Sequence, residues 1–137
     1  MRHGRNHILT KAAIALTSLV LLVGLPKAAA EIDGRKLDQE EIVELLSGAT
    51  LYGVYLDGRP DWAEQSTVTG ELYDAADKWR EVGRWGTSGD VACYTYWAAM
   101  RQYCFDVYEQ DGQFYFYVPG TDTLVAYTYR IDRDEMM

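Results

Sequence analysis

The chain has 137 residues and is acidic, with 13 Lys and Arg residues against 21 Asp and Glu residues and a net charge of −8 at pH 7. Such a surface makes nucleic acid and anionic membranes poor partners, whereas it attracts a basic protein or a cationic ligand. The length fits one domain, and the sequence contains no internal repeat or linker that would divide it.

The first 30 residues have the pattern of a secretory signal peptide. A basic segment precedes an apolar run over residues 12–25, and small residues form a cleavage site that ends at Ala30. This run is shorter than the roughly 20 residues that cross a bilayer. We therefore expect cleavage after Ala30, no stable membrane anchor, and a domain over residues 31–137 that is periplasmic or secreted.

Removal of this segment changes the chemistry available to the domain. Both histidines, His3 and His7, lie in it together with four of the 13 basic residues, so residues 31–137 hold nine basic against 21 acidic residues, a net charge of −12. Without imidazole the domain lacks the usual proton shuttle at neutral pH and the commonest metal ligand. We expect a non-catalytic protein without a metal or other cofactor.

One short helix is predicted at the start of the domain, over residues 39–47. Asp38 and Glu41 have the spacing of a capping box, apolar residues follow at helical spacing, and Gly48 is a natural stop. Two turns of helix are marginal alone. The helix should therefore dock on the rest of the domain, where it would plug one end of the structure that the strands build.

From residue 49 onward, segments rich in Tyr, Val, Thr, Phe and Trp alternate with turn residues. Strands are predicted over residues 49–56, 62–68, 71–75, 79–86, 91–97, 103–110, 113–118 and 123–131. The stretch 74–78 fits either a loop or a helical turn. Seven to eight strands after one short helix predict a mainly β fold, an antiparallel meander that closes into a small lipocalin-like barrel, because closure removes exposed edges. A β-sandwich is the alternative.

The only two cysteines, Cys93 and Cys104, lie in neighbouring predicted strands. In an exported chain we expect them to form a disulfide across a hairpin. For a loop of about 12 residues, the bond would stabilise the fold by roughly 3 kcal/mol. A redox-catalytic role is the alternative, but such motifs usually place two residues between the cysteines.

Carboxylates are the groups left for catalysis. A glycosidase uses two acids across a cleft, and the candidates here are Asp61, Glu64, Glu71, Asp106 and Glu109. These acids lie in or beside predicted strands, where acidic residues usually face solvent, and this disfavours a catalytic pair. A carboxylate-dependent hydrolase is therefore kept only as an alternative. The acidic stretches 57–61 and 109–112 are interpreted as turns rather than calcium sites, because neither has the spacing of an EF-hand.

The aromatic residues are the feature best suited to contact a ligand. All 18 lie within residues 31–137, and in the segments 94–97, 114–117 and 127–129 they alternate so that they line one face of a strand. At 114–117 they cover both faces. The predicted binding residues are Trp62, Tyr94, Tyr96 and Trp97. Ordinary packing of amphipathic strands is the alternative.

Several of these features together resemble a group of small exported proteobacterial proteins whose domain has no assigned function. They are the export signal, the short acidic helix, the strand opening Thr50-Leu51-Tyr52-Gly53, the element Gly83-Arg84-Trp85, and the pair Cys93 and Cys104. This resemblance implies no catalytic residue. Gly83 and Trp85 also resemble the G-x-W strand element of lipocalin-like barrels, which implies a barrel that encloses a small apolar ligand.

The sequence thus predicts an exported non-catalytic binding protein that recognises a small ligand or a basic protein through an aromatic-rich β surface. A second hypothesis is an inhibitor of a basic cell-wall lytic enzyme, in which Asp57, Asp61 or Asp111 on a turn enters a cationic cleft. A hollow barrel would favour ligand carriage, and an interior filled by aromatic side chains would favour protein recognition.

Overall fold

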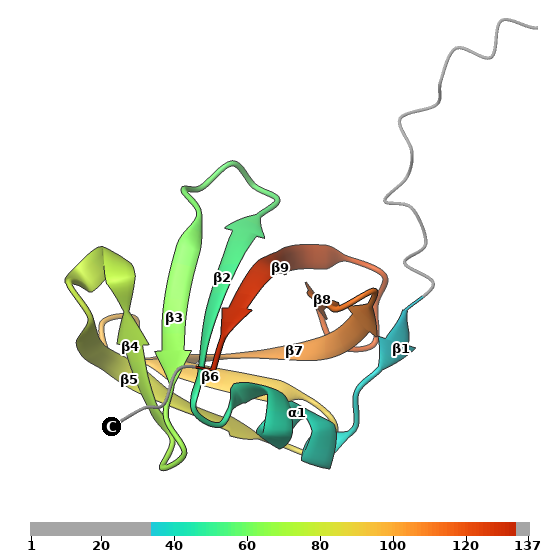
Figure 1. Ribbon diagram of the computed structural model, residues 1–137, viewed down its shortest axis with the longest axis horizontal. Helices are drawn as coiled ribbons and strands as arrows, with labels where there is room; N and C mark the ends of the chain where they lie inside the picture. The colour runs from blue at the N-terminus through green and yellow to red at the C-terminus, as the bar shows by residue number, and fades with distance from the viewer. Residues whose placement is uncertain (1–33, 134–137) are drawn as a thin grey trace, which may run out of the picture.

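Eight antiparallel strands follow one another around a closed barrel in the computed structural model, which describes residues 34–133 (Figure 1). The predicted signal peptide over residues 1–30, with His3 and His7, lies outside the described residues. The elements in chain order are β1 (Arg35–Lys36), α1 (Gln39–Leu46), β2 (Ala49–Tyr55), β3 (Trp62–Ser66), β4 (Glu71–Asp74), the 3-10 turn η1 (Ala75–Asp77), β5 (Arg80–Thr87), β6 (Ala92–Tyr96), β7 (Arg101–Gln110), β8 (Gln113–Tyr117) and β9 (Leu124–Asp132).

The barrel closes because each strand from β2 to β9 pairs with the next one, and β9 returns to pair with β2. The two-residue strand β1 pairs with β7 as a further strand. Closure satisfies the backbone groups that an open sheet leaves unpaired at its edges. The predicted meander barrel is therefore confirmed. The β-sandwich alternative is wrong, because all the strands belong to one continuous sheet.

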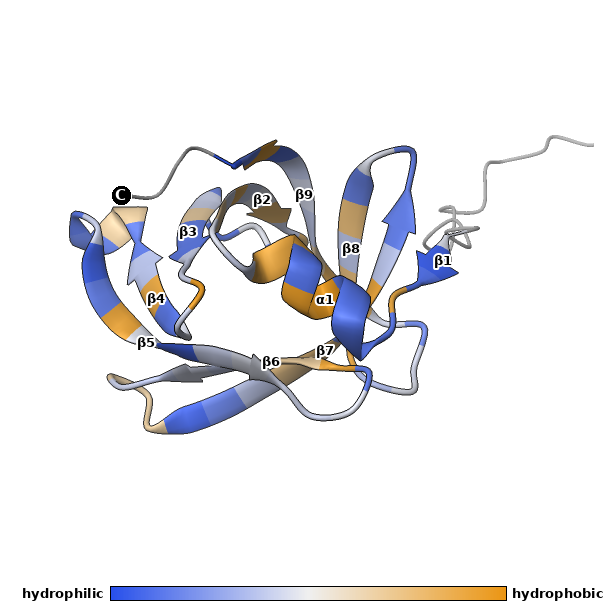
Figure 2. Ribbon diagram, turned by 60° about the horizontal axis from the view of Figure 1, so that its bottom comes forward, coloured by the Kyte–Doolittle hydropathy of each residue, from blue (hydrophilic) through white to orange (hydrophobic). Residues whose placement is uncertain are grey.

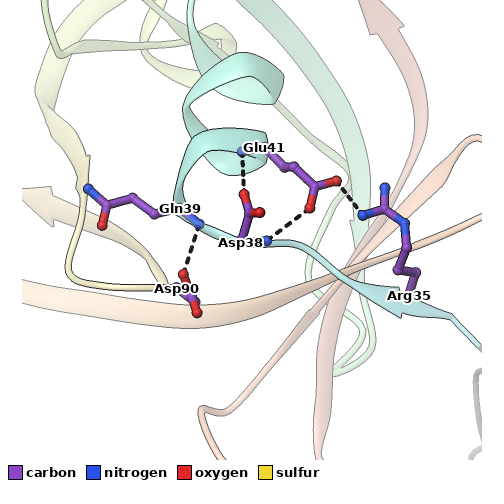
Figure 3. Close-up of polar contacts among 5 residues, drawn as sticks. All are labelled: Arg35, Asp38, Gln39, Glu41 and Asp90. Atoms are coloured by element: carbon purple, nitrogen blue, oxygen red, sulfur yellow. Dashed lines mark hydrogen bonds and ion pairs between the residues drawn. The ribbon is translucent and has the colours of Figure 1, made fainter.

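The helix begins with the predicted capping box (Figure 3). The Asp38 carboxylate accepts a hydrogen bond from the Glu41 backbone N–H at 2.9 Å, and the Glu41 side chain accepts one from the Asp38 N–H at 3.3 Å. The Gln39 N–H donates to the Asp90 carboxylate at 2.9 Å, which ties the start of α1 to the turn between β5 and β6. Gly48, with a φ of +72°, follows the helix as the predicted stop.

The two ends of the barrel differ, and the alternation of strand directions decides which turns meet at each end. The turns at 67–70, 88–91 and 111–112 lie at the end where α1 joins β2, and we call this the closed end. The turns at 56–61, 97–100 and 118–123, together with η1, lie at the opposite end, which we call the open end. In Figure 1, α1 accordingly lies away from the turn that joins β2 to β3.

The helix fills the closed end. Ile42, Leu45 and Leu46 are buried, with exposed fractions of 0–3%. Figure 2 shows α1 lying across the barrel, with hydrophobic segments between hydrophilic ones. The buried core cluster comprises Leu37, Ile42, Leu45, Leu46, Ala49, Leu51, Leu72, Ala92, Tyr94, Val107 and Phe116. A helix of two turns is therefore stabilised by docking, as its length requires.

Two turns show how local sequence sets the backbone. Residues 74–78 form a helical turn rather than a loop: the Asp74 carboxylate accepts from the Ala76 N–H at 2.8 Å, and Lys78 ends the turn with a φ of 56°. Asp111 and Gly112 have φ values of 53° and 78° and join β7 to β8. Positive φ at both positions is the geometry of a type I′ hairpin turn, and this confirms the interpretation of 109–112 as a turn.

The predicted disulfide between Cys93 and Cys104 is present, with the two residues directly opposite each other on β6 and β7. Such a bond is typical of an oxidising compartment. Within residues 34–133, no helix combines the length and the apolar character needed to cross a membrane.

Candidate functional site

The open end leads into a cavity of about 660 Å³ inside the barrel. Its walls come from residues of β2, β3, β6, β7, β8 and β9, and its mouth from the turns that carry Arg59, Ala99 and Pro119. The barrel is therefore plugged by α1 at one end and hollow at the other. Cavities of 300–1,000 Å³ are typical of small-molecule sites.

The cavity has an aromatic wall, which we define by seven rings. They are Tyr55, Trp62, Tyr94, Tyr96, Tyr103, Phe105 and Phe116. Each ring contacts the next around the interior, in the order Tyr55, Trp62, Phe116, Phe105, Tyr94, Tyr96 and Tyr103, with centroid distances of 6.0–6.4 Å. These are ordinary distances for interacting rings, so the wall is a continuous packed surface rather than a set of isolated side chains.

Trp62 lies where it does because the facing residue of β2 is a glycine. A Cβ atom at Gly53 would lie 2.2 Å from Cζ2 of the Trp62 ring and 2.6 Å from the Tyr127 carbonyl oxygen. The ring therefore packs directly on the backbone of β2. The Trp62 Nε1–H is buried and has no hydrogen-bond partner among the described residues.

Glu64 is the one acidic residue in the cavity lining, as far as the described chain extends. Its side chain is buried, with 8% exposed, and the Tyr96 hydroxyl donates to its two carboxylate oxygens at 3.0 and 2.8 Å. Burial raises the pKa of Glu64 to about 7, because the charged form loses its hydration; the Tyr96 hydrogen bond lowers the pKa, and the nearby Asp74 raises it further.

Three tyrosines of the wall, Tyr55, Tyr94 and Tyr96, stay neutral. Burial raises the pKa of Tyr55 to about 12, and burial together with the charge on Glu64 raises the pKa values of Tyr94 and Tyr96 well above the ordinary range for a phenol. Their hydroxyl groups are therefore hydrogen-bond donors at neutral pH. The wall offers ring faces, hydroxyl donors and one carboxyl group.

The prediction that Glu64 faces solvent is wrong, because it shares the inward phase of β3 with Trp62 and Ser66. The sequence contained a signal for this position, because residues two apart in a strand lie on the same face and Trp62 was predicted to contact a ligand. Among the other candidate acids, Asp106 is also buried, with 5% exposed, but Lys36 lies 3.3 Å from it and the Gly120 N–H donates to it at 2.7 Å.

The remaining candidate acids lie elsewhere. Asp61 is exposed beside the mouth, and Glu109 accepts from the Gly112 N–H in the β7–β8 turn. Glu71 accepts hydrogen bonds from the Thr67 and Thr69 hydroxyls at the closed end, which lower its pKa to about 2. The five candidate acids are therefore not brought together in the cavity.

Three of the four predicted binding residues share the cavity. Trp62, Tyr94 and Tyr96 line it, whereas Trp97 is 50% exposed in the turn that follows β6. Trp97 directly follows the inward-facing Tyr96, so alternation gives it the opposite phase, and the strand ends before it. The other four rings of the wall were not among the predicted binding residues. Two of them follow from the pairing of β6 with β7: Tyr103 lies directly opposite Tyr94, and Phe105 is two residues further along the same face.

Large apolar side chains are exposed around the mouth. They are Leu56, Trp79, Trp97, Met100 and Val118, which come from four different connections at the open end, and we call them the apolar rim. On the outer face, by contrast, the rings of the segment 114–117 are paired: Tyr115 stacks on Tyr127 and Tyr117 packs edge-on against Tyr108. The outward rings of that segment thus follow the packing alternative.

Comparisons with protein-family models, with curated proteins and with solved structures find no match to this chain. They identify neither the exported proteobacterial group nor the lipocalin-like proteins that the motifs resemble. The structure itself supports the fold: a small eight-stranded antiparallel barrel with one disulfide and an aromatic-lined interior.

Proposed function

We propose that this protein is an exported, non-catalytic binding protein that holds a small, largely apolar ligand inside the barrel. The observation that carries the proposal is the cavity of about 660 Å³, lined by seven aromatic rings and open at one end only. Sites for small molecules are concave and mostly apolar, with a few polar groups that orient the ligand. The aromatic wall and Glu64 have this composition.

Binding is favoured over hydrolysis by the number of acids in the wall. Glycoside hydrolysis generally uses two carboxyl groups on either side of the bond that breaks. Among the described residues, Glu64 is the only acid that lines the cavity. Asp74, which raises the pKa of Glu64, accepts a hydrogen bond at the start of η1 and does not line the cavity. For this reason the proposal assigns no turnover to the site.

Ligand binding is also favoured over inhibition of a basic lytic enzyme. Asp57 already pairs with Arg59 at 2.7 Å, and Asp111 lies at the closed end, far along the barrel from the turn that carries Asp57 and Asp61. The three acids therefore do not form one acidic surface. The apolar rim gives the mouth the character of a ligand entrance instead.

The test is a titration with N-phenyl-1-naphthylamine, a neutral probe whose emission rises in apolar surroundings. Ala126→Phe places a ring inside the cavity, because Ala126 lines it opposite Phe116. Ala63→Phe is the matched control: Ala63 lies between the inward residues Trp62 and Glu64, so its side chain points away from the interior.

We expect saturable binding of one probe per chain, weakened about tenfold or more by A126F, a loss of about 1.4 kcal/mol, and unchanged by A63F. Thermal unfolding of both variants checks that they fold. Displacement of the probe by 1-dodecanol measures the same site without a mutation. Absence of saturable binding to the natural sequence, or equal losses in the two variants, would overturn the proposal.

A further inference from the structure

Glu64 differs from the other buried acid of the barrel in having no cationic partner. Asp106 and Glu64 are similarly buried, with 5% and 8% exposed. Lys36 lies 3.3 Å from Asp106, whereas none of the ion pairs within residues 34–133 includes Glu64. Buried acidic residues are almost always paired, because a carboxylate that leaves water loses several kcal/mol of hydration.

The groups around Glu64 are suited to a positive charge. The rings of Tyr55, Trp62, Tyr94 and Tyr96 line the same cavity, and the faces of such rings attract cations. Tyr94 and Tyr96 stack with an interplanar angle of 14°, next to the carboxyl group that Tyr96 contacts. An ammonium group in this cavity would have a carboxylate and four aromatic rings in the same lining.

The cations at the mouth are weaker determinants of ligand charge. Arg59 is exposed, is paired with Asp57, and lies 3.8 Å from the centre of the Tyr55 ring. Arg101 is exposed and lies 5.2 Å from the centre of the Tyr103 ring. Interactions of exposed charges are small because water screens them, whereas a charge buried in the cavity wall is screened much less.

We infer that the ligand of this cavity carries a protonated amine on an apolar body, and that the amine pairs with the Glu64 carboxylate against the aromatic wall. This inference rests on the proposed function and names the chemical class of its ligand. Glu64 is the residue that selects the charge, and the rings of the wall contact the apolar body. The Glu64 carboxylate is the anion of this pair, and the protonated amine of the ligand is the cation.

The experiment compares three ligands with the same chain length, each used below the concentration at which it forms micelles. Dodecylamine, 1-dodecanol and dodecanoate compete with bound N-phenyl-1-naphthylamine at pH 8. We expect dodecylamine to displace the probe at a concentration about tenfold or more lower than dodecanol, since an ion pair with a desolvated carboxylate exceeds a neutral contact by at least 1.4 kcal/mol. Dodecanoate should be the weakest competitor.

Two variants assign this preference to one residue. Glu64→Gln keeps the shape and removes the charge, so the amine and the alcohol should compete equally while the alcohol keeps its affinity. Glu71→Gln is the matched control, because Glu71 is an acid that bonds to Thr67 and Thr69 at the closed end and does not line the cavity. The preference for the amine should survive in E71Q.

Lowering the pH tests the same pair without a mutation. The titratable and charged groups near Glu64 are Tyr55 on β2, Asp74 on β4, Tyr94 and Tyr96 on β6, Tyr103 and Arg101 on β7, and Arg59 at the mouth. Burial raises the pKa values of Tyr55, Tyr94 and Tyr96, so these hydroxyls keep their protons between pH 8 and pH 5. The preference for the amine should therefore fall at pH 5, where Glu64 is protonated.

Each result decides one of the two proposals. Equal competition by amine and alcohol in the natural sequence, or a preference lost equally in E64Q and E71Q, overturns the inference and leaves the proposed function standing. Tightest binding of dodecanoate also overturns it, and assigns recognition to Arg59 and Arg101. Absence of probe binding and of competition by any ligand overturns the proposed function and the inference with it.

Discussion

The two ends of the barrel are built from the same strands and have opposite interiors. At the closed end, Ile42, Leu45 and Leu46 of α1 fill the space between the strands, and the Trp85 Nε1–H donates to the Thr67 carbonyl at 2.8 Å. At the open end, aromatic rings surround a cavity, and the Nε1–H of Trp62 has no partner among the described residues.

This difference places the stabilising contacts at one end of the barrel and the cavity at the other. Apolar packing and satisfied polar groups at the closed end stabilise the fold. Residues at the open end leave volume unfilled and a carboxyl group that pairs with no cation of the described chain, and both features cost stability. The closed end therefore stabilises a barrel whose other end encloses a cavity. Substitutions that change one end at a time test this difference.

The largest effect is expected for Ile42→Ala at the closed end. Ile42 is fully buried, and loss of its side chain leaves a cavity in the core, which lowers the free energy of unfolding by about 2–5 kcal/mol. Val43→Ala is the matched control on the same helix, because Val43 is 40% exposed. Urea unfolding of the two variants measures the difference. A similar decrease in the free energy of unfolding in both variants would show that the buried face of α1 does not stabilise the closed end.

The second effect is the pH dependence that Glu64 gives to the open end. Its pKa is raised from the ordinary 4.5 to about 7 in the folded state, so the unfolded chain releases the proton first as the pH rises. The free energy of unfolding therefore falls between pH 4.5 and pH 7, by about 3 kcal/mol. Below pH 4.5 the carboxyl group is protonated in both states and has no effect.

Glu64→Gln removes this titration. The variant should be more stable than the natural sequence at pH 8, by up to about 3 kcal/mol, and equal to it at pH 4. Urea unfolding at several pH values measures the two curves. An unchanged decline in E64Q between pH 4.5 and pH 7 would assign the pH dependence to other groups.

A smaller effect is expected at Gly53, beneath the aromatic wall. Gly53→Ala places a methyl group against the Trp62 ring and the Tyr127 carbonyl, and overpacking of this kind costs about 1–3 kcal/mol. Gly86→Ala is the control, because no heavy atom lies within 4 Å of a Cβ built there. Thermal unfolding and Trp emission follow both. A stable G53A with an unaltered emission spectrum would contradict the described position of Trp62.

The smallest effect is expected at the cap of α1. Asp38→Ala removes the acceptor for the Glu41 N–H and should lower the free energy of unfolding by about 1 kcal/mol. Glu40→Ala, in the first turn of the same helix but outside the capping box, should cost only a few tenths of that. If the two substitutions had equal effects, the capping box would not be the stabilising element.

The sequence predicted the features that local patterns determine. The capping box at Asp38, the turn at Asp111 and Gly112, and the disulfide across one hairpin each depend on residues close together in the chain, and all are present. Trp62, Tyr94 and Tyr96 were selected together and share the cavity, because each lies in the inward phase of its strand. Period-two alternation was sufficient for this.

The features that depend on the whole barrel were not predictable in this way. The alternation from Trp62 to Ser66 places Glu64 in the same phase as Trp62, but neither phase is uniformly apolar, so only the predicted role of Trp62 indicated which phase faces inward. Whether a barrel is hollow depends on the summed volume of inward side chains from all eight strands and on how far the helix enters. Trp97 was selected although it directly follows Tyr96, and period-two alternation places it on the opposite face, just beyond the end of β6.

The disulfide links the two strands that carry four of the seven rings around the cavity: Tyr94 and Tyr96 on β6, and Tyr103 and Phe105 on β7. This covalent bond holds β6 and β7 together in the wall of the cavity. The docking of α1 at the closed end depends on apolar packing instead. Thiol reductants should therefore loosen the barrel wall at β6 and β7 before they disturb the packing of α1 at the closed end.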